Sequence, residues 1–272
     1  MITDKDFSYI RDLVRARCGL VLSDDKHYLV ETRLSPLLQS SSLRSIAELV
    51  SALRQQEDQL QRQVVELMMT NETYFFRDVV PFDVLHQVAI PTLAASRAAS
   101  GELAIWSAAC STGQEPYSIA LLLREEFQRL SSWKVRILAS DISTSVLARA
   151  RLGRYSQYEI SRGLPPHLLK HLQPSSDSWT IRDDVRGMVE FRQINLLSAW
   201  DDLPTMDIIF LRNVLIYFSD DDKRRILSRI RQLLRPDGYL FLGGAESTMH
   251  LDDHFERMLI DRAGCYRLRG EA

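Results

Sequence analysis

Two carboxylates, Glu115 and Asp141, stand in the sequence where nucleotide-binding folds hold their ligand. The stretch Leu103–Leu123 has the pattern of a short apolar strand, a turn of small residues that ends at Gly113, and an amphipathic helix. Val135–Asp141 is a second apolar strand that ends in a carboxylate. In such folds, an acid at the end of the second strand accepts hydrogen bonds from ribose hydroxyls. This arrangement predicts a ligand that contains adenosine.

The turn before the helix differs from a dinucleotide fingerprint, in which three glycines let a pyrophosphate approach the helix N-terminus. Glu115 occupies that helix start, and a carboxylate there repels phosphate. It can instead pair with an ammonium group or stabilise a sulfonium. S-adenosylmethionine carries both of these cations and no phosphate. The turn alone leaves a second interpretation open, in which Glu115 only complements the helix dipole.

More polar residues follow the third and fourth expected strands. Asn195 comes after one of them, and Asn213 and Tyr217 come after the other. Open α/β sheets bind their ligands at the carboxyl ends of the strands. Asn195 can therefore read an adenine edge there, while Asn213 and Tyr217 can face a cofactor. Taken singly, each is also explained as a turn or cap residue, and only their shared location favours a site.

The segment Asn71–Asp78 (NETYFFRD) places Arg77 beside a cluster of aromatic residues. An arginine near an apolar wall is costly unless it is paired or binds something. The alternative is that Phe75 and Phe76 belong to the core while Arg77 pairs with Asp78 or another acid.

Strands and helices alternate from about residue 102, and they must position these side chains. The expected strands are 103–107, 135–141, 189–193, 207–211 and 239–243, and the expected helices are 114–130, 143–151 and 220–234. This alternation predicts an α/β fold, a parallel sheet with helices on both faces. Phe255–Ile260 and Cys265–Arg269, around a turn at Asp261–Gly264, predict an antiparallel hairpin at the sheet edge. That hairpin distinguishes methyltransferase-type sheets from all-parallel dehydrogenase sheets.

The rest of the chain predicts further domains. Residues 1–78 form an all-helical N-terminal domain, with apolar residues at helical spacing such as Phe7, Ile10 and Val14. Residues 79–101 read as a helix followed by a linker of small residues at Ala94–Gly101, and residues 102–272 form the ligand-binding domain. Glycines and prolines interrupt the alternation at about 152–188, which predicts a small inserted β-subdomain.

Composition excludes several classes of protein. The 272 residues carry a formal net charge of −2, which gives no support for non-specific nucleic-acid binding. Three widely spaced cysteines and six scattered histidines predict neither a disulfide framework nor a metal site. The polar first residues and the lack of a long apolar run predict no signal peptide and no membrane insertion. The expected location is the cytoplasm.

Six motifs in this order and spacing resemble the CheR-type chemotaxis receptor methyltransferases, and the resemblance covers nearly the whole chain. They are NETYFFRD, WSAACSTGQEPYSIA, ASDIS, INLL, RNVLIYF and RPDGYLFLGGAES. The resemblance implies a Rossmann-like S-adenosylmethionine-dependent methyltransferase sheet with a small inserted β-subdomain, preceded by an all-α domain. It also implies methyl transfer from S-adenosylmethionine to glutamate side chains of chemoreceptors. The products would be glutamyl 5-O-methyl esters and S-adenosylhomocysteine.

The resemblance also implies residue roles. Cofactor contacts are implied at Asn71, Thr73, Arg77, Glu115, Asp141, Asn195, Leu196, Arg212 and Asn213. Substrate-side, catalytic roles are implied for Arg77 and Tyr217. A glutamate carboxylate has an unperturbed pKa near ~4.3, so it is already an anion at neutral pH and needs no general base. Arg77 is suited to orienting that carboxylate, and Tyr217 to holding its second oxygen or lining the methyl channel.

Two predictions concern the receptor. Methylation segments in this family are acidic helices, and Arg11 and Arg15 share one helix face at i, i+4 spacing, which predicts a basic docking face. The alternative is a solvated surface on which Asp12 and nearby acids cancel the field. Some members grip a C-terminal receptor pentapeptide through the inserted subdomain and a glycine-containing loop. The loop at residues 173–178 (QPSSDS) is short and lacks glycine, so tight tethering is not expected. A monomer is expected.

Two other functions remain open. One is a methyltransferase for another acceptor, such as RNA or a small molecule; the lack of an Asn-Pro-Pro-Tyr motif and of excess positive charge disfavours it. The other is a regulatory S-adenosylmethionine-binding module that has lost catalysis; the presence of Arg77 and Tyr217 disfavours that one.

Overall fold

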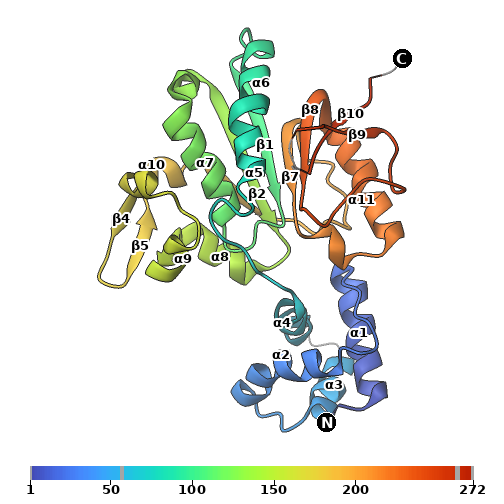
Figure 1. The fold of residues 1–272 in the computed structure, drawn as a ribbon. Coiled ribbons are helices and arrows are strands. Elements are labelled where there is room, and N and C mark those ends of the chain that lie inside the picture. The colour runs from blue at the N-terminus through green and yellow to red at the C-terminus, as the bar shows by residue number, and fades with distance from the viewer. Residues whose placement is uncertain (1, 56–57, 261–263, 271–272) are drawn as a thin grey trace. The chain divides into compact units, whose positions relative to one another are not determined.

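Contacts divide the chain into two compact units. The computed structural model describes residues 2–55, 58–260 and 264–270 (Figure 1). One unit, which we call the helical unit, consists of Met1–Thr70 with Tyr217–Asp222. The other, which we call the sheet unit, consists of Asn71–Ile216 with Lys223–Ala272. The predicted limits at residues 78 and 101 differ from this division and stay a prediction about functional domains.

The helical unit confirms that the N-terminal region is all helical. Its helices are α1 (Asp4–Cys18), α2 (His27–Ser40), α3 (Ile46–Arg54) and α4 (Asp58–Met68). The Thr3 side chain caps the start of α1 by accepting a hydrogen bond from the Asp6 N–H. The apolar residues at helical spacing, including Phe7, Ile10 and Val14, are buried and build the core of this unit.

The segment Tyr217–Asp222 joins the helical unit although it is far away in sequence. The Val21 N–H donates a hydrogen bond of 2.9 Å to the Tyr217 carbonyl. This backbone bond makes Tyr217 part of the unit that α1 and α2 build.

The sheet unit contains a seven-stranded sheet in the order β6-β2-β1-β7-β8-β10-β9. The parallel strands are β1 (Glu102–Ala108), β2 (Lys134–Asp141), β6 (Val189–Gln193), β7 (Met206–Leu211) and β8 (Leu234–Leu242). β10 (Cys265–Leu268) runs antiparallel to both β8 and β9 (Phe255–Arg257). The predicted parallel sheet and edge hairpin are confirmed, while residues 261–263 of the predicted turn lie outside the described residues.

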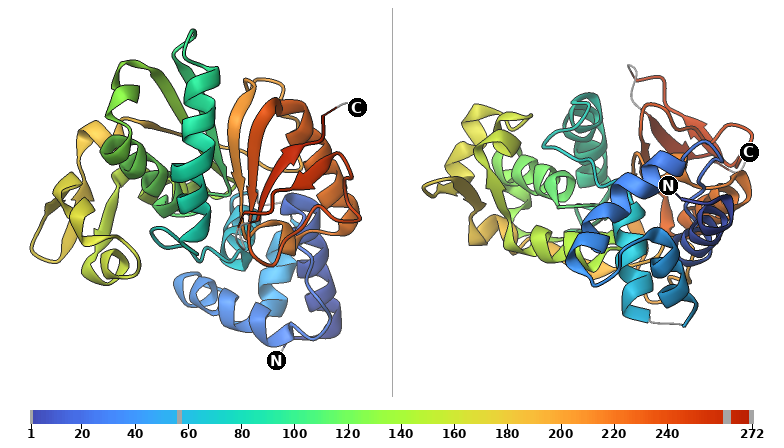
Figure 2. Two further views of the ribbon diagram at one scale, coloured as in Figure 1. Left: turned by 45° about the horizontal axis from the view of Figure 1, so that its top comes forward. Right: turned by 90° about the horizontal axis from the view of Figure 1, so that it is seen from below.

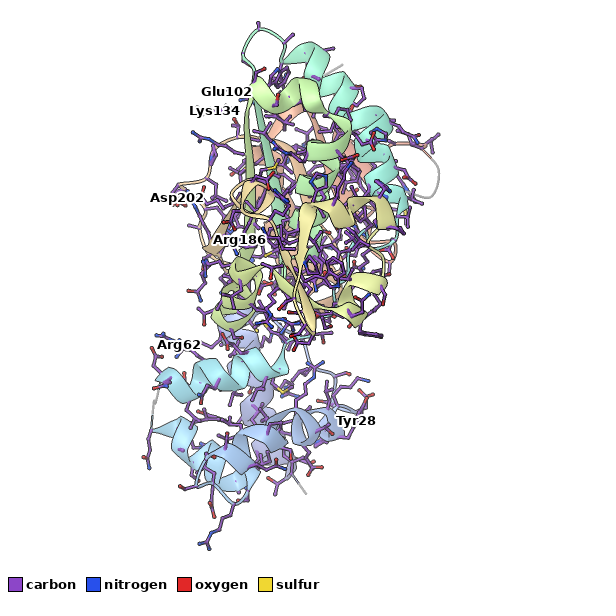
Figure 3. The ribbon with its side chains drawn as sticks, turned by 90° about the vertical axis from the view of Figure 1, so that its left-hand side faces the viewer. Tyr28, Arg62, Glu102, Lys134, Arg186 and Asp202 are labelled. Carbon is purple, nitrogen blue, oxygen red and sulfur yellow. The ribbon has the colours of Figure 1, made fainter. Side chains whose placement is uncertain are left out.

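From β1, the chain continues to β2 and β6 on one side of the sheet, and then to β7 and β8 on the other side. Ligands are expected at the carboxyl ends of β1 and β7, where this switch occurs. The amino ends lie at the opposite edge and are marked by Glu102 and Lys134. Figure 3 shows these two side chains next to each other, and Lys134 Nζ lies 2.9 Å from Glu102 Oε1.

Helices cover both faces of this sheet. Helices α5 (Val80–Val84), α6 (Ile90–Ser96) and α7 (Gln114–Glu126) lie along one face (Figure 2). The sheet side chains that include Ile105, Ile137 and Phe210 share one apolar core with these helices. Trp106 points to the other face, where its ring lies 5.1 Å from the ring of Trp200. The unit also contains a π-helical turn (Leu85–Ala89), α8 (Thr144–Leu152) and most of α11 (Asp220–Leu233).

Two local predictions differ from the structure. The helix expected over 114–130 ends at Glu126, and a 3-10 turn follows at Gln128–Ser132. The small-residue stretch expected as a linker is helical through Ser96, and Arg97 then pairs with two acids of the sheet, Asp207 and Asp237. These ion pairs hold the stretch against the sheet.

The predicted inserted subdomain is present. It contains β3 (Arg154–Ser156), α9 (Gln157–Ser161), a 3-10 helix (Pro166–His171), β4 (Leu172–Pro174), β5 (Ser178–Ile181) and α10 (Asp183–Arg186). Its three strands form an antiparallel sheet in the order β3-β5-β4. Within the parts of the chain that are described, no helix is both long and apolar enough to cross a bilayer.

Candidate active site

The loop that follows β1 carries a strained backbone at the carboxyl edge of the sheet. Ala109 and Ser111 have φ angles of 56° and 50°, in the left-handed region that non-glycine residues rarely adopt. Gly113 has φ 93°, and a Cβ there would lie 2.9 Å from the Ala150 side chain. The glycine therefore lets the loop approach α8 closely. Strain of this kind persists where surrounding contacts enforce it, as at ligand sites.

Two buried tyrosines that the sequence did not single out form hydrogen bonds here, one to the loop and one to α8. The hydroxyl of Tyr155 donates to the Thr112 carbonyl at 2.8 Å, and that of Tyr117 donates to the Ala150 carbonyl at 2.9 Å. Burial raises the pKa of both phenols, so both stay protonated and able to donate. Burial also raises the pKa of the Cys110 thiol, which argues against a nucleophilic thiolate.

Asp141 ends β2 and faces the loop after β1. Its Oδ2 accepts a hydrogen bond of 2.9 Å from the Ser111 N–H, and its Oδ1 accepts one of 3.0 Å from the Ser143 N–H. The Asp141 carbonyl accepts from the Ile194 N–H at 3.0 Å, which brings the chain leading into Asn195 beside it. Asp141 is thus a buried carboxylate at the end of β2, where such folds place an acceptor for ribose hydroxyls.

Glu115 and Arg212 meet at the centre of this edge. Glu115 Oε1 accepts from the Ser107 hydroxyl at 2.8 Å, and its Oε2 lies 2.9 Å from Arg212 Nη1. Arg212 Nη2 lies 2.8 Å from both the Arg77 carbonyl and Asp78 Oδ2. Two carboxylates around one guanidinium leave an excess of negative charge, which suits a cationic ligand group.

Arg212 is nearly fully buried, with a side chain 1% exposed. Its Nε–H has no acceptor among the described residues. Burial of a guanidinium is tolerated because Glu115 and Asp78 compensate its charge, and an unpaired buried donor is costly. The arginine thus fixes the segment Arg77–Asp78 to α7 and keeps one donor unused.

The segment Asn71–Asp78 runs along the same edge. The Asn71 carbonyl accepts from the Ser111 hydroxyl at 2.8 Å, which ties the start of the segment to the loop after β1. Phe75 and Phe76 are buried, as the core interpretation predicted. Arg77 does not pair with Asp78, as the alternative interpretation allowed, and that carboxylate instead binds Arg212. The Arg77 guanidinium instead donates to the Glu72 carbonyl at 2.7 Å.

A cavity of about 460 Å³ opens beside this segment within the sheet unit. Asn71 and Thr73 line it, together with Thr112 and Gln114 from the loop and the start of α7. Arg162 also lines the cavity; it lies 2.5 Å from Glu72 and above the ring of Tyr74. The two predicted residues Asn71 and Thr73 therefore share one hollow with the loop.

Asn195 and Leu196, two further predicted cofactor residues, follow β6. The Asn195 side chain accepts from the Leu197 N–H at 2.9 Å, which is the turn role that was left open. Leu196 is buried, and its carbonyl lies within reach of Arg229. Their place after β6 still puts them at the edge that carries Asp141.

The last two predicted residues follow β7. Asn213 has φ 58°, and its N–H donates to Glu246 Oε2 at 2.7 Å. Tyr217 belongs to the helical unit. Its neighbour there is Arg33, a residue that the sequence did not single out. Arg33 donates to the Met68 carbonyl and to Thr70 Oγ1, burial lowers the pKa of its guanidinium, and the phenol of Tyr217 opposes that shift.

Comparison with known proteins decides between the families that such a sheet allows. Residues 71–263 match the family described as "CheR methyltransferase, SAM binding domain", and residues 5–69 match "CheR methyltransferase, all-alpha domain". The chain belongs to the CheR methyltransferase family.

Relatives within this CheR family match along nearly their whole length. The chain is 41% identical to chemotaxis protein methyltransferase 1 of Pseudomonas aeruginosa, over 97% of this chain and 98% of the relative. It is 40% identical to chemotaxis protein methyltransferase Cher2 of Pseudomonas putida, over 92% and 93% of the two chains. It is 39% identical to a chemotaxis protein methyltransferase of Vibrio anguillarum, over 98% of each.

As a CheR methyltransferase, the chain uses S-adenosylmethionine as its methyl donor. The observed edge fits this cofactor. Asp141 places a carboxylate at the end of β2, where ribose hydroxyls are bound in such folds, and the negative excess around Glu115 and Arg212 suits an ammonium and a sulfonium. The unused Nε–H of the buried Arg212 is a donor for a polar ligand atom.

Proposed function

We propose that this enzyme transfers the methyl group of S-adenosylmethionine to glutamate side chains in the cytoplasmic domains of chemoreceptors. The products are glutamyl 5-O-methyl esters, which serve chemotactic adaptation, and S-adenosylhomocysteine. The relatives named as chemotaxis protein methyltransferases support this substrate class. Cytoplasmic location and a monomeric state belong to the proposal, as does the absence of nucleic-acid binding and of membrane insertion.

The observation that carries the proposal is the set of hydrogen bonds that Arg77 makes. Its backbone carbonyl is anchored by Arg212 at the cofactor edge, while its guanidinium donates to a carbonyl rather than to a carboxylate. A guanidinium has five N–H donors, and the only hydrogen bond from the Arg77 guanidinium to another described residue goes to the Glu72 carbonyl, so donors remain for an acceptor carboxylate. An acceptor that is itself a carboxylate explains an arginine presented in this way.

The chemistry requires little from the protein beyond orientation. A glutamate carboxylate is an anion at neutral pH, since its unperturbed pKa is about 4.3. A carboxylate oxygen forms the new bond to the methyl carbon as the sulfur–carbon bond breaks, and the bonding pair stays on sulfur. Arg77 would align the carboxylate and Tyr217 would hold its second oxygen or line the methyl path. Both would help to exclude water from two groups of opposite charge.

The cofactor would be held by residues of the carboxyl edge. We assign Asp141 to the ribose hydroxyls and Glu115 to the ammonium group. The full proposed set is Asn71, Thr73, Arg77, Glu115, Asp141, Asn195, Leu196, Arg212 and Asn213. The geometry described above supports this set most strongly at Asp141, Glu115 and Arg212.

The helical N-terminal domain would dock the receptor. We propose limits of 1–78 for that domain, 79–101 for a connecting helix and linker, and 102–272 for the catalytic domain, with the insertion at about 152–188. On the proposed docking face, Arg11 is half-buried and its charge is met by Asp24 at 2.7 Å. Arg15 is exposed and therefore offers the more available charge to acidic methylation helices.

Tight capture of a receptor C-terminal pentapeptide is not part of the proposal. In the hairpin that joins β4 to β5, the Ser175 N–H donates to the Ser178 carbonyl at 2.7 Å. Proline, serine and aspartate in this short loop leave no glycine for a close backbone approach.

One experiment separates this function from its alternatives. The protein is incubated with methyl-tritiated S-adenosylmethionine and receptor-containing membranes, and the washed protein is treated with mild base. Release of volatile tritiated methanol from the receptor band is expected, because glutamyl methyl esters hydrolyse under these conditions. Label that is stable to base would indicate another acceptor. Cofactor binding without any label would indicate a regulatory module.

A further inference from the structure

The turn that follows β7 is held by one side chain from the segment after β8. Glu246 Oε2 accepts from the N–H groups of Asn213 and Gly243, both at 2.7 Å. Glu246 Oε1 accepts from the N–H groups of Val214 and Leu215, at 2.8 and 2.7 Å. The glutamate is buried, with 8% of its surface exposed. Oε1 also accepts a longer bond of 3.4 Å from the Ile216 N–H, so one carboxylate meets five backbone donors.

These donors form an anion site whose occupant comes from the chain itself. Converging backbone N–H groups create a concavity that favours negative charge, and bonds to a charged acceptor are stronger than neutral ones. Asn213 adopts φ 58°, a conformation that needs support from its surroundings. Glu246 binds the N–H groups on both sides of the Asn213 Cα, so it supplies that support directly.

Gly243 shows how closely the two segments approach. A Cβ at this position would lie 2.7 Å from Asn213 Nδ2, 2.7 Å from Glu246 Oε2 and 2.9 Å from the Asn213 backbone nitrogen. The Asn213 side chain therefore lies directly over the glycine. Its direction depends on the bare Cα of Gly243 as well as on the carboxylate of Glu246.

We propose that Glu246 is a positioning residue for methyl transfer. It holds the turn Asn213–Ile216 in its strained conformation and thereby directs the Asn213 side chain toward the cofactor. The proposal rests on the cofactor role assigned to Asn213 under the proposed function. Glu246 itself contacts backbone groups and acts only through the turn, so its effect on the cofactor must pass through Asn213.

The first test replaces one acceptor oxygen. In Glu246→Gln, the amide NH₂ faces backbone N–H groups, and the resulting repulsion should release the turn. Affinity for S-adenosylhomocysteine, measured by calorimetry below the melting temperature, should fall by about tenfold or more, and kcat should fall with it. Glu246→Asp keeps a carboxylate and should recover part of both.

The matched control is Asp207→Asn at the opposite end of β7. Asp207 is also a buried carboxylate that accepts from a backbone N–H, that of Ala104 at 2.8 Å. This variant should lower the melting temperature but leave the affinity for S-adenosylhomocysteine unchanged. An equal loss of affinity in Asp207→Asn would reduce Glu246 to a general stabiliser and overturn the proposal.

A double-mutant cycle tests the route through Asn213. Asn213→Gly removes the side chain and tolerates the positive φ. The double variant with Glu246→Gln should bind no more weakly than the weaker single variant, because both changes remove the same interaction. Additive losses would overturn the proposal. Gly243→Ala keeps the carboxylate, displaces the turn and should reproduce the loss; it also decides the question if Glu246→Gln does not fold.

The outcomes keep the two proposals apart. Full affinity and kcat in Glu246→Gln, together with weak binding in Asn213→Gly, would refute the positioning role and leave the cofactor role of Asn213 intact. Full affinity in Asn213→Gly would refute that cofactor role, and the positioning role with it.

Discussion

The two ends of the central sheet use the same chemistry for different purposes. At the amino end, Arg97 donates from Nε to Asp207 and from both Nη atoms to Asp237, so each of its nitrogens has an acceptor. At the carboxyl end, Arg212 is also held by two carboxylates, yet its Nε–H has no acceptor among the described residues. Both arginines join distant segments, but of the two only Arg212 has an N–H donor without an acceptor among the described residues.

The backbone shows the same contrast. Positive φ angles at Ala109, Ser111 and Asn213 all lie in segments that leave the carboxyl ends of β1 and β7. Near the amino ends, Glu102 and Lys134 pair in regular strand register. The pairing of β7 with β8 does shift register between Met206 and Ile208, beside Asp207. A saturated ion-pair cluster stabilises the fold, whereas an unsaturated one among loops with positive φ angles is expected at a ligand site.

The largest expected effect comes from replacing each arginine by lysine, which keeps the charge but not the forked geometry. Arg212→Lys should weaken binding of S-adenosylhomocysteine by about 10- to 100-fold, because a charge-assisted network at the site is lost. Arg97→Lys should destabilise the protein by about 1–3 kcal/mol and leave that affinity unchanged. Calorimetry and denaturant unfolding measure the two quantities. Equal losses of affinity in both variants would contradict the comparison.

A second pair of variants compares the buried acids at the two ends. Asp141→Asn should weaken S-adenosylmethionine binding by about 1–3 kcal/mol, since an anionic acceptor for the ribose hydroxyls is lost. Asp207→Asn should bind the cofactor normally. Calorimetry on folded protein checks both, and an unchanged affinity in Asp141→Asn would refute the ribose assignment.

A smaller effect is expected from Tyr217→Phe, which keeps the ring and removes the hydroxyl. Cofactor affinity should stay within about twofold while kcat falls by about tenfold, the pattern of an interaction used mainly in the transition state. Tyr9→Phe is the control within the helical unit, where the guanidinium of Arg54 lies over the Tyr9 ring. This variant should change neither cofactor affinity nor kcat. If cofactor affinity and kcat fell in parallel, Tyr217 would be a cofactor residue instead.

The sequence predicted the regular elements well because apolar periodicity is a local signal. The predicted core strands, edge hairpin and inserted subdomain lie close to the observed ones, except that β8 begins at Leu234 rather than at residue 239 and β9 ends at Arg257 rather than at residue 260. The helix that ends at Glu126 was extended to residue 130, because the apolar Leu130 continues the pattern into a 3-10 turn. The expected linker before Gly101 is anchored by Arg97, whose partners lie 110 and 140 residues away.

The candidate site shows the same limit. Glu115 was expected to meet a cationic ligand group, and the structure gives it Arg212 as a partner 97 residues away. No pattern pointed to Glu246, because its acceptor role depends on backbone donors that converge only in the folded chain. Residue types at strand ends predict a site at the carboxyl ends of the strands, and the roles of these residues stay a prediction. Glu115 and Glu246 each have partners in a distant segment of the chain, which could be identified only from the structure.

The smallest expected effect concerns acid stability at the amino end. Hydrogen bonds from Arg97 lower the pKa of Asp237 below its usual range. A carboxylate whose pKa is lower in the folded state stabilises the fold above its unfolded pKa, near ~3.9, and loses that contribution as the pH falls through the folded value. Wild-type protein should therefore lose stability more steeply below about pH 4 than Asp237→Asn does.

Urea unfolding at a series of pH values measures this difference, with wild type and Asp237→Asn compared at each pH. The effect should be modest, because Asp237 is partly exposed and solvent screens its charge. Parallel curves for the two proteins would show that the pair with Arg97 does not stabilise the folded state. Binding of S-adenosylhomocysteine at neutral pH should be the same in both, because this cluster lies at the end of the sheet away from Asp141. A loss of binding in Asp237→Asn would mean that the amino end also shapes the site, and the division of roles between the two ends would fail.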